Sequence, residues 1–244
     1  MNKKYISLTL AIVLFTACGG SSSSKVAGEG SIDLKAYYPN ASMTKTFLPV
    51  ENGLNKSTHD EVITVNGQTI TTEVNSVIIE NMVFTDKNIT TTTTEGTSTD
   101  TSLSYRHVDL GDTIISHSFK STKPDELGEI TTNFELVCKL KSKEEKYTSN
   151  GNEYSGDLLK IECIKEGEVI YDIKPALLAS EFVNTDLNGS HIIYNQSYIY
   201  LKKDWGEVAR IDDDCIPKDK PNEAINDKSS QCEKENSYYE FYLP

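Results

Sequence analysis

The sequence lacks the short motifs that mark most enzyme active sites. It contains no G-x-S-x-G, no H-E-x-x-H, no phosphate-binding loop and no G-x-G-x-x-G dinucleotide fingerprint. Histidine is scarce, with four residues scattered along the chain, and there is one tryptophan. We therefore expect no catalytic residues, no cofactor and a protein that is not an enzyme.

Long apolar segments are also missing, apart from one near the amino terminus. The run from Ile6 to Ala17 is about a dozen residues long, which suits a secretory leader and is too short to cross a bilayer. Lys3 and Lys4 precede this run, and Phe15-Thr16-Ala17-Cys18 ends it. A positive start, an apolar run and a bulky-small-small-cysteine ending together resemble the signal peptide and lipobox of bacterial lipoproteins.

In that family the cysteine thiol receives a diacylglyceryl group, and a dedicated signal peptidase cuts just before the cysteine. The resemblance implies that residues 1–17 are a leader, that Cys18 is the lipid attachment site, and that acyl chains hold the protein to a membrane. Gly19, where an aspartate would imply retention in the inner membrane, favours the outer membrane of the cell envelope. The alternative is an ordinary secretory leader followed by a cysteine.

Residues 18–30 resemble a flexible tether rather than a folded segment. Gly19-Gly20 is followed by four serines, so this stretch has almost nothing to pack and a root-mean-square reach of about 20 Å. Residues 31–244 then form one domain, because no second linker interrupts them.

Positive charge is in deficit. The chain has 24 Lys and Arg against 37 Asp and Glu, a net charge of −13, and loss of Lys3 and Lys4 with the leader makes the mature chain more acidic still. Such a domain repels nucleic acids and anionic lipid surfaces. We expect no nucleic-acid partner, and membrane contact only through the anchor.

Four further cysteines suit a disulfide-permitting compartment. Asn150-Gly151 is a strong hairpin turn pattern, and folding the chain there places Cys138 opposite Cys163 and Lys139 opposite Glu162. This register puts the two cysteines at a non-hydrogen-bonded site, where a disulfide can close. A zinc site is the competing interpretation, but no Cys-x-x-Cys pair supports it.

The other two cysteines, Cys215 and Cys232, are then expected to form a second disulfide that closes the loop between them, within a polar loop expected over residues 212–234. Carboxylates gather there, and calcium prefers oxygen ligands. This makes a weak calcium site conceivable, but the EF-hand order is absent and a hydrated acidic loop is the simpler interpretation. The candidate ligands are Asp212, Asp213, Asp214 and Asp219.

Short β-rich segments separated by turn residues predict a mainly β fold, an antiparallel meander forming a sandwich or an open half-barrel. The only helix expected is short, at 175–183. The expected strands are 61–65 and 68–74 around Asn66-Gly67, 77–85, 89–94 and 97–107, 113–119, the disulfide hairpin, 168–173, 191–202, 207–211 and 238–243.

Two repeating patterns have simple structural interpretations. Tyr194, Tyr198 and Tyr200 alternate along one expected strand; they could form a stacking platform for sugars, but core packing is the commoner role. The threonine run at 90–94 fits a solvated strand face better than a glycosylated stalk, because prolines are absent.

Two classes of function remain. The first is a non-enzymatic envelope protein that binds a protein or a glycan. The second is a periplasmic carrier that holds a lipid or other hydrophobic ligand in a β half-barrel. A dry apolar cavity on the concave face would favour the carrier, and a filled core with an exposed aromatic or acidic patch would favour the binding module.

Overall fold

The computed structural model describes residues 31–51, 54–95, 98–124, 128–149, 152–174, 188–217 and 232–242. These residues are mainly β. The elements in chain order are β1 (Ile32–Asp33), the 3-10 turn η1 (Leu34–Tyr37), β2 (Met43–Glu51), β3 (Leu54–Asn55), β4 (His59–Asn66), β5 (Thr69–Val74), β6 (Val77–Phe84), β7 (Asn88–Glu95), β8 (Ser98–Tyr105), β9 (His107–Val108), β10 (Thr113–Pro124), β11 (Gly128–Ser149), β12 (Asn152–Ile173), β13 (Gly189–Lys202), β14 (Gly206–Pro217) and β15 (Cys232–Tyr242). None of the helical segments in the described part is long and apolar enough to span a membrane.

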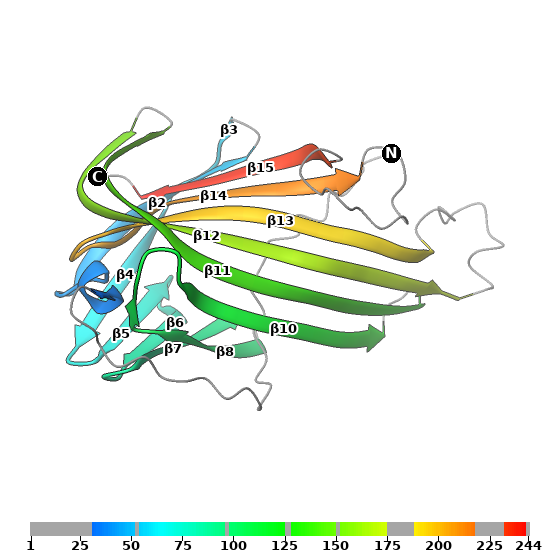
Figure 1. The fold of residues 1–244 in the computed structure, drawn as a ribbon, viewed down its shortest axis with the longest axis horizontal. Coiled ribbons are helices and arrows are strands. Elements are labelled where there is room, and N and C mark those ends of the chain that lie inside the picture. Colours follow the sequence, from blue (N-terminus) through cyan, green and yellow to red (C-terminus); the bar gives the residue numbers. More distant parts are fainter. Residues whose placement is uncertain are drawn as a thin grey trace.

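One large antiparallel sheet contains nearly all of these strands. Its order is β10-β11-β12-β13-β14-β15-β2-β4-β5-β6-β7-β8, with β3 beside β2, while β1 and β9 form a small separate pair. The last strand, β15, pairs with β2 and so joins two meanders into one sheet. Figure 1 shows long strands from β10 to β15 and shorter ones from β4 to β8. The predicted mainly β, antiparallel fold is confirmed.

The inner face of the sheet holds the main hydrophobic core. Strands far apart in the sheet order contribute to the same cluster, so the sheet must curl until its two arms face each other. The β1–η1 segment also packs into this core. The buried members of the main core include Leu34, Ile63, Ile70, Phe84, Ile89, Val108, Leu136, Leu140, Leu159, Ile161 and Leu201.

The β11–β12 hairpin confirms the register expected from the sequence. Cys138 lies opposite Cys163 with 4.0 Å between their Cα atoms, the two form a disulfide, and Lys139 lies opposite Glu162. The Asn150-Gly151 turn itself lies outside the described residues. Because side chains alternate along a strand, this register sends the cysteines into the core and the Lys139 and Glu162 side chains to the outer face.

Two irregularities interrupt this ladder and cancel each other. One register shift follows Leu140 and the other follows Glu144, in opposite directions, so Ser149 still pairs with Asn152. Bulges bend and twist a hairpin. Its far end turns back over the sheet in Figure 1, where a second buried cluster forms from Leu48, Val50, Tyr154, Leu158, Tyr200, Val208 and Ala209.

The β4–β5 hairpin is present, but its turn lies one residue later than predicted. Asn66 pairs with Thr69, so the two loop residues are Gly67 and Gln68, and Gly67 has a φ of 61°. Glycine at the first loop position is typical of a type II′ turn. The predicted register would have placed Gln68 in the ladder facing the apolar interior, whereas the observed one leaves it in the turn.

The predicted polar loop at 212–234 is wrong at both ends. Asp212 to Pro217 continue β14, and Cys232 to Lys234 begin β15. Pairing with neighbouring strands on both sides of β14 outweighs the polar sequence of its last residues. Residues 218–231 and the predicted helix at 175–183 lie outside the described residues.

Candidate functional site

The predicted disulfide residues have a structural role. Cys138 and Cys163 are buried in the main core and link the two longest strands. The predicted lipid attachment site Cys18 lies outside the described residues, as do the predicted leader and the predicted tether.

Three of the four predicted calcium ligands lie in a strand and not in the loop that the sequence predicted. Asp212, Asp213 and Asp214 lie in β14, paired with Ser197, Gln196 and Asn195 of β13, rather than in a loop. Asp219 lies outside the described residues. Among the side chains that the structure describes, no group of three or more His, Cys, Asp or Glu is arranged to hold a metal ion.

For the second predicted disulfide, the structure describes only the backbone positions of the two cysteines. Cys215 in β14 lies opposite Lys234, and Cys232 in β15 lies opposite Pro217. The two cysteines are therefore on paired strands, offset by two residues, and their linkage stays a prediction.

The interior of the curled sheet carries ionisable groups beside its apolar core. Lys45 on β2 is only 5% exposed, and its Nζ donates to the backbone oxygen of Glu207 at 3.1 Å and lies 4.1 Å from the Trp205 ring centre. Arg210 donates twice to the Glu207 carboxylate, at 3.1 and 3.0 Å. Glu80 completes this group, which we call the interior charge cluster.

Burial shifts the pKa values of Lys45 and Glu80 toward neutral pH. Desolvation lowers the pKa of Lys45 to about 8, although three nearby glutamates oppose the shift. Desolvation, followed by the negative charge of Glu207, raises the pKa of Glu80 to about 7, against the opposing charge of Arg210. Glu80 is therefore a carboxyl group that exchanges its proton near pH 7.

Replacing Glu80 with glutamine should change the pH dependence of stability. The pKa of Glu80 is higher in the folded protein, at about 7, than its ordinary value of 4.5, so its contribution to stability is fully present below pH 4.5 and is lost as pH rises through 7. Chemical denaturation from pH 5 to 8 should show Glu80→Gln gaining stability relative to wild type as pH rises. Glu129→Gln, at an exposed position of β11, is the control, and an unchanged difference across this range would contradict the shift.

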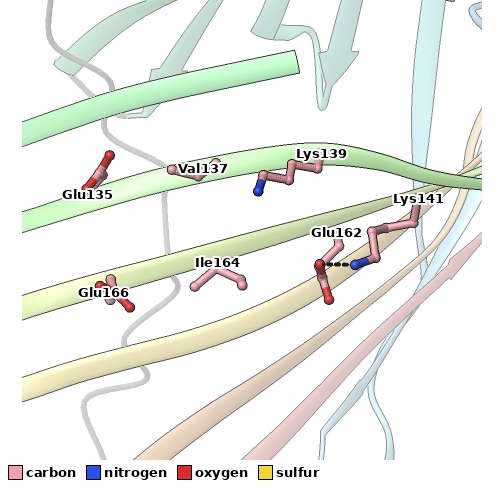
Figure 2. Close-up of a pocket in the computed structure, with 7 residues that line it drawn as sticks. All are labelled: Glu135, Val137, Lys139, Lys141, Glu162, Ile164 and Glu166. Atoms are coloured by element: carbon pink, nitrogen blue, oxygen red, sulfur yellow. Dashed lines mark ion pairs between the residues drawn. The ribbon is translucent and has the colours of Figure 1, made fainter. Parts of the chain in front are cut away.

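The outer face of β11 and β12 carries a shallow hollow of about 280 Å³ (Figure 2). Cross-strand pairs build it: Glu135 with Glu166, Val137 with Ile164, and Lys139 with Glu162. Glu135 and Glu166 lie at one end, two aliphatic side chains lie in the middle, and Glu162 lies at the other end with the two lysines (Figure 2). Its lining residues are Glu135, Val137, Lys139, Lys141, Glu162, Ile164 and Glu166.

Glu162 is held in this hollow by three neighbouring side chains. Its carboxylate accepts from Gln196 at 2.9 Å and from the Tyr198 hydroxyl at 3.3 Å, and forms an ion pair with Lys141 at 2.8 Å. Burial alone would raise the pKa of Glu162, but the hydrogen bonds from Lys141, Gln196 and Tyr198 together hold it below its usual value. The carboxylate therefore stays charged and fixed in place at neutral pH.

The tyrosines expected to pack in a core divide between two roles. Tyr200 is buried in the second cluster, where it stacks on Tyr147 with ring centres 3.8 Å apart, so the core interpretation is confirmed for it. Tyr198 packs against the same cluster, donates to Glu162 at the hollow, and has its ring centre 4.3 Å from Lys160 Nζ. The sequence interpretation missed this hollow, although the predicted pairing of Lys139 with Glu162 already located one end of it.

The hollow offers fixed charges of both signs around a small apolar floor, which suits recognition of another molecule. Comparisons of the chain with protein-family models, with curated proteins and with solved structures found no match.

Proposed function

We propose that the chain is a lipid-anchored protein of the bacterial cell envelope whose β domain binds a protein partner at the outer hollow, without catalysis. The anchor rests on the lipobox resemblance at Phe15 to Cys18. The disulfide between Cys138 and Cys163 supports an exported domain, because such bonds persist in oxidising compartments. The outer membrane is the proposed location.

The observation that carries the binding role is the filled interior. A carrier needs an apolar volume for its cargo, but the inner face of this sheet is occupied by packed side chains such as Leu140 and Leu159, which are fully buried. Beside them lies the interior charge cluster with Lys45, a poor lining for a lipid chain. The hollow at Glu162, by contrast, lies on the outer face.

Mixed charge favours a protein partner over a neutral glycan. Lys139 and Lys141 lie at one end of the hollow, and Glu135 and Glu166 lie at the other, with Val137 and Ile164 between them (Figure 2). A protein surface can match such alternating charges, and electrostatic complementarity gives both register and specificity. A neutral sugar would leave most of these charges without a counterpart.

Photo-crosslinking in intact cells tests this proposal. A benzophenone amino acid in place of Val137 should give a covalent protein adduct, and Lys139→Glu should weaken that adduct because it reverses one matching charge. The same photoreactive residue at Leu110, which is 56% exposed in the turn before β10, is the control and should give none. A glycan adduct would select the alternative ligand class. Absence of any adduct from position 137, with a non-covalently bound lipid found on the purified protein by native mass spectrometry, would favour the carrier.

A further inference from the structure

The outer face of strands β4 to β8 carries a regular array of uncharged side chains. One row crosses all five strands through Thr64, Thr71, Asn81, Thr92 and Thr101, each opposite the next in the backbone ladder. The adjacent row is made of Asn66, Thr69, Val83, Thr90 and Leu103. We call these ten residues the Thr–Asn face.

This face turns away from the core and is accessible. Alternation places its members opposite the inward side chains of the same strands, among them the buried Ile63, Ile70 and Ile89. Thr64 and Asn66 are exposed, and the other threonines of the face are half-buried. The absence of charge is unusual in a chain of which 25% is charged, and Glu73 stands only at the border of the face, opposite Val62.

Exposed aliphatic side chains gather in the same region. Val83 and Leu103, members of the face, are 38% and 58% exposed, and Val62 at its border is 46% exposed. Ile78, opposite Glu73 at the start of β6, is also exposed. Such a group of exposed apolar side chains on one surface is typical of an interaction site.

The hydroxyl and amide groups of the face match a copy of the same face. A threonine hydroxyl both donates and accepts, and neighbours within the rows already pair in this way: Thr92 with Thr101 at 3.3 Å, and Thr71 donating to Asn81 at 3.4 Å. An array of groups that donate and accept is complementary to itself, as the two halves of a two-fold symmetric interface must be.

The charge of the chain favours an uncharged face for contact between two copies. Two copies of a chain with a net charge of −13 repel each other, and charged faces brought together would add the cost of burying like charges. Contact through the Thr–Asn face avoids that cost. We propose that this face is the interface of a symmetric dimer, formed by a second copy of the chain.

The test is the mass of the full-length protein in non-ionic detergent, measured by analytical ultracentrifugation across a concentration series. Wild type should be a dimer that dissociates on dilution. Leu103→Asp and Thr92→Glu each place two like charges across the two-fold axis and should weaken the dimer by about 100-fold or more. Leu110→Asp, at a similarly exposed apolar position outside the face, should dimerise like wild type.

Two results would overturn the dimer. One is a wild-type protein that stays monomeric at every concentration. The other is a dimer that survives both Leu103→Asp and Thr92→Glu, since the interface would then lie elsewhere. Melting curves of each variant confirm that it is folded, and photo-crosslinking at Val137 reports separately on the outer hollow, so the dimer and the proposed function can fail independently.

Discussion

Cys18→Ala is expected to move the protein from the membrane fraction to the soluble fraction. Cys18 carries the proposed acyl chains, and without its thiol no diacylglyceryl group can be attached. Two or three chains make attachment effectively stable. The acidic charge of the chain disfavours anionic lipid surfaces, so electrostatic attraction to them would not replace the anchor. The change should be nearly complete rather than graded.

Cell fractionation with immunoblotting measures this shift. The variant should be expressed behind an ordinary cleavable secretory leader, so that an uncleaved apolar leader cannot itself hold the chain at the membrane. Ser22→Ala in the native chain alters the tether without touching the anchor and should remain in the membrane fraction. Persistence of the alanine variant at position 18 in membranes would rule out the acyl anchor.

Removing the core disulfide should have the largest effect on stability. Replacing both Cys138 and Cys163 with alanine opens a loop with a sequence separation of 25, which costs about 3 kcal/mol in the chain-entropy account. For a domain of this size such a loss lowers the melting temperature by about 6–12 °C. The alanines also leave space among buried neighbours, which adds to the loss.

Thermal denaturation of the oxidised wild type and the double variant gives this difference directly. Non-reducing peptide mapping of the wild type should recover Cys138 linked to Cys163. A peptide joining Cys138 to Cys215 would contradict the register of the β11–β12 hairpin, and an unchanged melting temperature would show that the bridge adds no stability. The same map tests the predicted link between Cys215 and Cys232.

Local patterns predicted the hairpins well. Alternating apolar residues and the Asn150-Gly151 turn placed Cys138 opposite Cys163, because a one-residue slip would turn every core side chain outward. The two bulges beyond Leu140 and Glu144 were not predictable, since nothing in the linear pattern marks a pair of shifts that cancel. The glycine at position 67 located the β4–β5 turn, but it did not determine whether Gly67 is the first or the second residue of the two-residue loop.

Long-range pairing was the part that the sequence could not supply. The pairing of β15 with β2 joins residues near both ends of the domain, and no local pattern encodes it. The same closure of the sheet buries Lys45, which shares the inner face of β2 with Met43 and Phe47. From the sequence alone, this lysine would be expected to lie in solvent. The interior charge cluster therefore follows from topology rather than from any motif.

Mass spectrometry of the mature protein extracted from membranes tests the proposed lipid anchor most directly. The amino-terminal peptide should begin at Cys18 and carry the mass of a diacylglyceryl group on sulfur, with or without a further acyl chain on the new amino group. A terminus that retains residues 1–17 would contradict cleavage of the leader, and a peptide beginning at Cys18 with no lipid would contradict attachment of this β domain to a membrane.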